Sequence, residues 1–257
     1  MRADLLLCGT GQAKSRTQAQ EMIKLGTVFC GGTAVTKPSW PVPEGGTLTV
    51  IGYEKKYVSR AGLKLEAALE RFGISAEGKI ALDIGASTGG FTDCLLSRGA
   101  ARVYAVDVGH GQLDVKLASD PRVVSMEGVN ARELSCSMDI IAADIVTMDV
   151  SFISQTHIIS EIVPFCSEGT VFVSLIKPQF EAGKENVGRG GIVRDPGAHR
   201  TAVGRVLNCA VKEGFCPIGA MRSPIPGGDG NTEFLAAFAF GRRWTPDMEG
   251  IYREVGL

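Results

Sequence analysis

Short apolar runs alternate with helix-like stretches through most of the chain after residue 79. Strand-like runs lie at 80–84, 103–106, 123–126, 145–148 and 171–176, and helical patterns lie at 91–97 and 158–165. This alternation predicts right-handed βαβ units and a mostly parallel, buried sheet. A last apolar run at 234–240, FLAAFAF, predicts one more strand. If that strand is antiparallel, its start lies at the carboxyl edge of the sheet.

A different pattern fills the first sixty residues. Ser15 is a predicted helix N-cap, Gln18 would complete a capping box with it, and Gly26 would end the helix. Short strand-like runs follow at 27–30, 34–37 and 48–51, the first two of them around the turn Gly31-Gly32. One helix and a small sheet predict a separate α+β domain.

The predicted domain plan has three parts and a linker. We expect the α+β domain over 1–58, an α/β Rossmann-like domain with a mostly parallel sheet over 59–243, and a tail without an assigned element over 244–257. Residues 53–57 are the predicted linker. Ser59 is expected to cap the next helix and Gly73 to end it.

Composition adds an asymmetry of charge. The chain of 257 residues is 44% hydrophobic and 21% charged, as in ordinary globular proteins, and its formal net charge is −1. Residues 1–58 nevertheless carry seven Lys and Arg against four Asp and Glu. A basic end on a neutral chain favours a polyanionic partner, with a solvated surface as the alternative.

Several classes of protein are disfavoured by what the sequence lacks. No run approaches the ~18–20 apolar residues of a membrane helix, so we expect a cytoplasmic protein that makes no membrane contact. The seven cysteines are odd in number and scattered, which favours reduced thiols. His110, His157 and His199 have no metal-ligand spacing, so no metal is expected.

Two groups of side chains are candidates to contact RNA phosphates. They are Arg16, Gln20 and Lys24 on one face of the first predicted helix, and Lys184, Arg189 and Arg194 in the glycine-rich segment 181–195. The spacing i, i+4, i+8 places the first three on one helical face. The second group would lie on a lid, because long loops inside a domain are more often functional than not. A mobile surface loop is the alternative.

The motif LDIGASTGGF, residues 82–91, is the main candidate for cofactor binding. It follows a predicted strand and opens a helix, so its glycines permit a tight turn and a close backbone approach to a ligand. Asp107 ends the next strand, where a carboxylate can bind a ribose. The expected cofactor-binding residues in these segments are Asp83, Gly85, Ala86, Ser87, Thr88, Gly89, Gly90, Phe91, Asp107 and Val108.

The glycine spacing separates two classes of cofactor. A dinucleotide site needs G-x-G-x-x-G to receive a pyrophosphate, and this turn has a different spacing. Asp83, directly before the turn, disfavours a pyrophosphate but suits a cationic amino-acid group. S-adenosylmethionine has that group and a ribose, so it is the predicted cofactor, and a nicotinamide dinucleotide is the alternative.

Four charged residues are the candidate catalytic group. Asp149 and Lys177 each follow a predicted strand, Glu233 precedes the last strand, and Lys64 flanks the apolar stripe of the helix before the sheet. A ribose hydroxyl needs a base before it can attack a methyl donor, and a lysine can be that base when its pKa falls toward ~7–8. Lys177 is the expected base and Lys64 its cationic neighbour. Asp149 would orient Lys177 and the hydroxyl, and Glu233 would hold Lys64 or the target ribose.

The sequence resembles known families over nearly its whole length. SRTQAQEMIKLGTVFCGGTAVTKPSWPVPEG is similar to the αL-type RNA-binding domain of a small-subunit ribosomal protein. VSRAGLKLEAAL, LDIGASTGGFTDCLL, MDVSFIS, LIKPQFE, VGRGGIVRDP and GNTEFL together resemble the TlyA family, which has an FtsJ-like methyltransferase domain.

This resemblance implies a function and a set of residues. It implies an S-adenosylmethionine-dependent rRNA (cytidine-2′-O-)-methyltransferase, with ribosomal RNA or ribosomal subunits as partner, although the family is also named haemolysin. Carried over by motif, its catalytic tetrad falls on Lys64, Asp149, Lys177 and Glu233, and Asn130 falls on the adenine side of the cofactor. A non-catalytic assembly factor, a membrane-active protein and a dinucleotide-dependent oxidoreductase are the other hypotheses.

Overall fold

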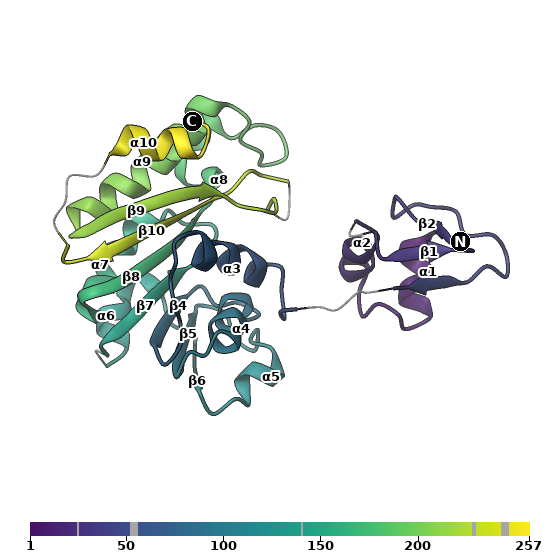
Figure 1. Ribbon diagram of the computed structural model, residues 1–257, viewed down its shortest axis with the longest axis horizontal. Coiled ribbons are helices and arrows are strands. Elements are labelled where there is room, and N and C mark those ends of the chain that lie inside the picture. The colour runs from purple at the N-terminus through teal and green to yellow at the C-terminus, as the bar shows by residue number, and fades with distance from the viewer. Residues whose placement is uncertain (25, 52–55, 140, 228–229, 243–246) are drawn as a thin grey trace. The chain divides into compact units, whose positions relative to one another are not determined.

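In the computed structural model, the chain divides into two units, Met1–Lys56 and Tyr57–Leu257 (Figure 1). The structure describes residues 1–24, 26–51, 56–139, 141–227, 230–242 and 247–257. Most of the predicted linker, 53–57, and the predicted boundary at 243/244 lie outside the described residues. Each unit is described here by itself.

The first unit has two helices and a three-stranded antiparallel sheet. Its elements are α1 (Ala3–Gly9), α2 (Arg16–Lys24), β1 (Val28–Cys30), β2 (Thr33–Ala34) and β3 (Leu48–Val50), with strand order β2-β1-β3. Its core includes Leu7, Met22, Ile23 and Val28. The predicted α+β character and the hairpin at Gly31-Gly32, where both φ angles are positive, are confirmed.

Ser15 caps α2 as predicted, since its Oγ accepts a hydrogen bond from Gln18 N at 3.2 Å. The predicted capping box differs in one detail. The Gln18 side chain accepts from Lys14 N at 2.6 Å instead of from Ser15 N, which holds the turn before the helix. The expected start of α2 is therefore confirmed with a modified cap.

The second unit is a seven-stranded sheet covered by helices. Its strands are β4 (Ile80–Ile84), β5 (Arg102–Asp107), β6 (Val123–Glu127), β7 (Ala143–Met148), β8 (Cys166–Ile176), β9 (Phe215–Arg222) and β10 (Phe234–Phe240). Their order is β6-β5-β4-β7-β8-β10-β9, and β10 is antiparallel to both of its neighbours (Figure 1). The predicted Rossmann-like fold is confirmed, and the last strand meets the condition under which its start lies at the carboxyl edge of the sheet.

Two separate cores lie on the two faces of this sheet. One lies under α3 (Ala61–Arg71), α4 (Gly90–Ser97) and α5 (Val115–Ala118). The other lies under α6 (Leu134–Ser137), α7 (Ile159–Ile162), α9 (Pro196–Lys212) and α10 (Met248–Glu254). Neighbouring strand residues alternate between the cores, with Leu82 in the second and Ala81 in the first. Burial of both faces keeps the sheet rigid and fixes the positions of its strand ends.

Some elements differ from the sequence prediction. No element was expected over α1, α5, α6, α9, β9 or α10, so the first unit has one helix more than predicted. The α10 helix contributes Ile251 and Tyr252 to the core. Ser59 does not cap α3, which begins after Arg60 without a side-chain cap. The remaining short elements are α8 (Pro178–Glu181) and the 3₁₀ turns Ala131–Glu133, Gln155–His157, Val163–Phe165 and Lys184–Asn186.

Candidate active site

The glycine-rich turn joins β4 to α4 at the carboxyl edge of the sheet. Gly85 and Gly89 have φ angles of 81° and 92°, a conformation that side chains with a Cβ rarely adopt. A Cβ on Gly85 would lie 2.7 Å from the Asp149 carbonyl oxygen, and one on Gly89 would lie 2.3 Å from a methyl of Leu117. The motif therefore needs glycine at both positions for backbone shape and for close packing against β7 and α5.

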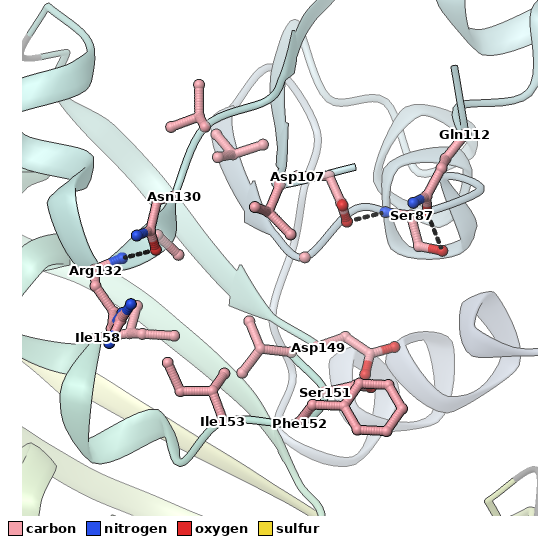
Figure 2. Close-up of a pocket in the computed structure, with 16 residues that line it drawn as sticks. Ser87, Asp107, Gln112, Asn130, Arg132, Asp149, Ser151, Phe152, Ile153 and Ile158 are labelled. Carbon is pink, nitrogen blue, oxygen red and sulfur yellow. Dashed lines mark hydrogen bonds between the residues drawn. The ribbon is translucent and has the colours of Figure 1, made fainter. Parts of the chain in front are cut away.

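A cavity of about 680 Å³ opens beside this turn (Figure 2). Asp107, at the end of β5, accepts hydrogen bonds from Ser87 N at Oδ2 and from Gly109 N at Oδ1, both at 2.8 Å. Asn130 lies across the hollow, and its Oδ1 accepts from Arg132 N at 3.1 Å. The carboxylate and the amide are thus both held by backbone contacts at opposite sides of the cavity.

Of the residues expected at the cofactor, Gly85, Ser87, Asp107, Val108 and Asn130 line this cavity. A smaller one of about 150 Å³ is lined by Gly85, Ala86, Ser87, Thr88, Gly90 and Phe91, together with Ser59, Ala61, Asp149, Ser151 and Lys177. The smaller cavity therefore connects the glycine-rich turn with two of the candidate catalytic residues. Gly89 and Asp83 are not among the described residues that line either cavity.

Asp83 lies in a different place from the one expected for a direct ligand contact. It is 0% exposed, and its two carboxylate oxygens accept hydrogen bonds from Thr92 Oγ1 at 2.7 Å and Thr147 Oγ1 at 2.8 Å. Burial raises the pKa of Asp83 to about 6, although the hydrogen bonds from the two threonine hydroxyls act to lower it. Asp83 joins α4, β4 and β7 beneath the turn, so it can influence a ligand through its charge but does not line the cavity.

Gln112, in the segment 109–113, lines the larger cavity and was not anticipated. Glu127, at the end of β6, accepts hydrogen bonds from the backbone N–H groups of Gly111, Gln112 and Leu113 at 2.7, 2.8 and 3.2 Å. These bonds lower the pKa of Glu127. The Gln112 side chain in turn accepts from Ser87 Oγ at 3.3 Å (Figure 2). The spacing of residues in the sequence did not predict this contact between Ser87 and Gln112.

The four candidate catalytic residues form two ion pairs. Lys177 Nζ lies 2.6 Å from Asp149 Oδ1 and donates to Ser151 Oγ at 2.7 Å. Lys64 Nζ donates to Glu233 Oε2 at 2.5 Å, and both of these side chains are buried. Asp149 and Lys177 follow the parallel strands β7 and β8, and Glu233 precedes the antiparallel β10. All four positions therefore meet at the carboxyl edge of the sheet.

The strand register places one member of each ion pair at adjacent positions on neighbouring strands. Phe234 pairs with Ile176, so Glu233 and Lys177 are the next residues on neighbouring strands. Asp149 Oδ1 is buried and lies at ion-pair distance from Lys177, yet it accepts no well-oriented hydrogen bond from the described residues.

Phe152 is a second residue that the sequence prediction missed. It lines the larger cavity, is 92% exposed and has a φ of 64°, a conformation that is uncommon for a residue with a side chain (Figure 2). Its ring lies 5.2 Å from that of Phe180 between centroids. An exposed aromatic ring in a strained backbone beside a cavity is typical of a functional surface.

The predicted lid is partly anchored. Its side chains Lys184, Arg189 and Arg194 are exposed. Asn231, which is buried, accepts from Val193 N at 3.0 Å and donates to the Gly191 carbonyl oxygen at 2.9 Å. Because Asn231 lies two residues before Glu233, one short turn holds both the loop and a member of the tetrad.

In the first unit, Arg16 and Lys24 are exposed and Gln20 is half-buried on α2. Arg16 pairs with the fully buried Asp4 at 3.3 Å, as does Arg2 at 2.9 Å. The hydrogen bond from Arg2 is the main reason that the pKa of Asp4 falls to about 2. Part of the charge expected on this face is therefore balanced inside the unit.

Neither a membrane span nor a metal cluster appears in the part of the chain that the structure describes. None of its helices combines the length and the apolar character needed to cross a bilayer. Within the same residues, no group of three or more His, Cys, Asp or Glu side chains could hold a metal ion.

The sheet order, the glycine-rich turn and the edge cavity define the class of Rossmann-like methyltransferases. Residues 57–240 match the family described as FtsJ-like methyltransferase, and residues 1–48 match the S4 domain. The 16S/23S rRNA (cytidine-2′-O)-methyltransferase TlyA of Mycobacterium tuberculosis is 44% identical over 91% of this chain and 88% of its own length. Hemolysin A of Brachyspira hyodysenteriae is 46% identical over 93% of this chain and 99% of its own. The chain therefore belongs to the TlyA family of FtsJ-like methyltransferases.

Solved structures agree with this assignment. A Streptococcus thermophilus protein described as a candidate hemolysin is 40% identical, with a TM-score of 0.76 over 98% of this chain and 94% of that one. The fibrillarin of Aeropyrum pernix, solved with bound S-adenosyl-L-methionine, is 13% identical, with a TM-score of 0.52 over 77% of this chain and 91% of its own. The second likeness shows the fold alone.

Proposed function

We propose that this protein transfers a methyl group from S-adenosylmethionine to the ribose 2′-hydroxyl of a cytidine in ribosomal RNA. The observation that carries the proposal is the Lys177–Asp149 pair on the wall of a cavity that opens onto the glycine-rich turn. The names of the similar rRNA methyltransferases support the reaction and the substrate class. The S4 domain supports RNA as the partner.

The larger cavity suits the nucleoside part of the cofactor. Asp107 would accept hydrogen bonds from the ribose hydroxyls, because each carboxylate oxygen has a lone pair beyond its backbone contact. Asn130 and Val108 would contact the adenine. A volume of about 680 Å³ lies in the range of small-molecule sites. The residues present therefore fit the cofactor.

The turn and the smaller cavity suit the amino-acid part. Gly85, Ser87 and Gly90 line the smaller cavity together with Ala86, Thr88 and Phe91. Gly89 would act through the shape of the turn, and Asp83 through its buried negative charge. When bound, S-adenosylmethionine supplies an electrophilic methyl group on a sulfonium.

Lys177 would remove the proton from the 2′-hydroxyl as the oxygen attacks. Its unprotonated Nζ has one lone pair, and taking the proton produces the ammonium that pairs with Asp149 and donates to Ser151. Asp149, which lines the smaller cavity, would orient both Lys177 and the hydroxyl. Lys64 would be the cationic neighbour of Lys177, and Glu233 would hold Lys64 through the ion pair between them. Correct placement of the hydroxyl supplies much of the rate.

RNA would be held by three surfaces. Arg16, Gln20 and Lys24 of α2 and the loop side chains Lys184, Arg189 and Arg194 would contact phosphates. Phe152 would stack on the target base, because proteins that act on single RNA bases commonly splay them onto aromatic rings.

Methyl incorporation from labelled S-adenosylmethionine into isolated ribosomal subunits tests the proposal. Wild type should label the RNA, whereas Lys177→Ala should lose at least about a hundredfold in rate. Lys79→Ala is the matched control, since Lys79 also pairs with an aspartate, Asp144, at 3.2 Å, but at the opposite end of the sheet. Equal labelling by Lys177→Ala and wild type, or none by wild type, would contradict the proposal.

A further inference from the structure

The segment from Asp149 to Gln155 supplies several groups of the candidate active site. Asp149 and Ser151 contact Lys177, and Phe152 projects into solvent at the cavity with a positive φ. At its first end the segment leaves β7, which pairs with β8 through Met148 and Ser174. Contacts at its second end decide whether the segment has one conformation.

Hydrogen bonds join that second end to residues before and after Lys177 in the sequence. Gln155, 1% exposed, donates from Nε2 to the Leu175 carbonyl oxygen at 2.6 Å and accepts from Ser174 Oγ, so it is bound to β8 just before Lys177. Glu181, also 1% exposed, accepts from Gln155 N at 2.8 Å and from Ser154 Oγ at 2.6 Å. Glu181 ends α8, which begins directly after Lys177.

A buried carboxylate at this place is costly for the fold. Burial raises the pKa of Glu181, while the hydrogen bonds from Ser154 and Gln155 and the charge of Arg205 lower it. The described residues place no cation within ion-pair distance of Glu181. Packing alone gives no reason for a charged group here, because a buried charge without a close cation is unfavourable.

The strained backbone of Phe152 supplies that reason. A residue with a side chain in the left-handed region is strained, and this conformation persists only where surrounding contacts hold it. The contact between the rings of Phe152 and Phe180 joins the segment to α8 from its exposed side. The Glu181 carboxylate, by contrast, binds two consecutive residues of the segment from inside.

We propose that Glu181 is a positioning residue for methyl transfer. Through Ser154 and Gln155 it holds the 149–153 segment so that Ser151 and Asp149 stay in contact with Lys177 and Phe152 stays presented at the cavity. Glu181 touches neither RNA nor cofactor in this role. The inference deepens the proposed function and rests on it for its kinetic consequence, but the placement of the segment can be measured without any reaction.

Glu181→Ala and Glu181→Gln are the informative variants, with Thr170→Ala as the matched control. Thr170 is equally buried between β7 and β8, and its Oγ1 donates to the Ala143 carbonyl oxygen at 2.7 Å, but it lies at the end of these strands remote from Lys177. All four proteins are full-length and have no ligand added in the first measurement. Amide hydrogen exchange of the peptide 149–155 is compared with that of β4.

Exchange in the 149–155 peptide should accelerate at least about tenfold in Glu181→Ala while β4 exchange changes little, because the loss is local. Glu181→Gln keeps one acceptor and should lie near wild type. Thr170→Ala should leave the 149–155 peptide as in wild type. Equal exchange of that peptide in Glu181→Ala and Thr170→Ala would overturn the proposal.

The second measurement is the single-turnover rate of methyl transfer against pH, with saturating RNA and cofactor. Glu181→Ala should lose about a hundredfold in rate from a misplacement of the order of 1 Å, and the acid limb of its profile should shift as Lys177 loses its contacts. Thr170→Ala should change the active fraction at most, not the profile. An unshifted profile for Glu181→Ala would overturn the proposal. Absence of transfer by wild type would instead contradict the proposed function, and the exchange result would still decide the positioning role.

Discussion

Asp83→Asn is the substitution whose effect on stability can be worked out most directly from the structure. The pKa of about 6 for Asp83 lies about two above the ordinary value of 3.8, because the carboxyl group is fully buried. Each unit of pKa is worth about 1.4 kcal/mol, so ionising Asp83 in the folded protein costs about 3 kcal/mol more than in the unfolded chain.

The sign follows from the raised pKa. The folded state holds the proton more tightly, so the stabilisation from Asp83 is complete below about pH 4 and is lost as the pH rises through about 6. About 2 kcal/mol of the loss falls between pH 4.5 and pH 7.5. Asparagine does not titrate, and it can accept from one threonine hydroxyl and donate to the other. The free energy of unfolding of Asp83→Asn minus that of wild type should therefore be about 2 kcal/mol more positive at pH 7.5 than at pH 4.5.

Urea unfolding at the two pH values measures this difference. Amide exchange of the β4 peptide, 80–84, isolates the second unit from the first. Asp120→Asn is a control that should show no such change between these two pH values, since the Arg122 side chain lowers the pKa of Asp120 to about 2 and its stabilisation is lost only as the pH falls below about 4. A difference between Asp83→Asn and wild type that does not change with pH would refute the reasoning.

Four further substitutions test other parts of the site. Lys64→Met leaves the buried Glu233 carboxylate unpaired and should lower the free energy of unfolding, measured with urea, by about 3–5 kcal/mol. The double variant Lys64→Met/Glu233→Leu should recover most of that free energy, and no recovery would contradict a buried pair. Gly89→Ala forces a Cβ into a neighbouring methyl group and a left-handed backbone, so calorimetry should give at least about tenfold weaker cofactor binding, and unchanged binding would argue against the turn. Asn231→Ala should raise the KM for RNA with an unchanged Kd for the cofactor, because it frees the loop but not the cavity; a change in the cofactor Kd alone would count against this role. Phe152→Ala should lower kcat/KM for RNA by about ten- to a hundredfold if it stacks on a base, and an effect below about twofold would exclude stacking.

The parallel sheet and the positions at its carboxyl edge could be predicted from local patterns. Asp107, Asp149 and Lys177 each lie at or directly after the end of an apolar run. They therefore fall at one edge of the sheet once the strands are known. The glycine-rich turn is equally local. The β9 strand was missed because Pro217 and Gly219 interrupt its pattern. In the structure β9 is an edge strand, and a bulge opposite Ala237 and Phe238 accommodates the proline.

Contacts between distant segments could not be predicted in this way. Asp83 looked like a ligand contact from its place before the turn, but Thr147, 64 residues away, closes the space around it. The hydrogen bond between Gln155 and Glu181 joins residues that are 26 positions apart, and no rule of sequence spacing predicts it. The burial of Tyr252 depends on its packing in the core beneath α9 and α10, because the sequence after residue 246 has no strong period of its own.

The position of the new methyl group on the nucleotide tests the central claim most directly. RNA labelled by the wild-type protein can be digested to nucleosides and analysed by mass spectrometry. A lysine base acting on a ribose hydroxyl predicts that the label is found in 2′-O-methylcytidine and that Lys177→Ala removes it. Label on the base of any nucleoside, or 2′-O-methylcytidine formed equally well by Lys177→Ala, would contradict the account.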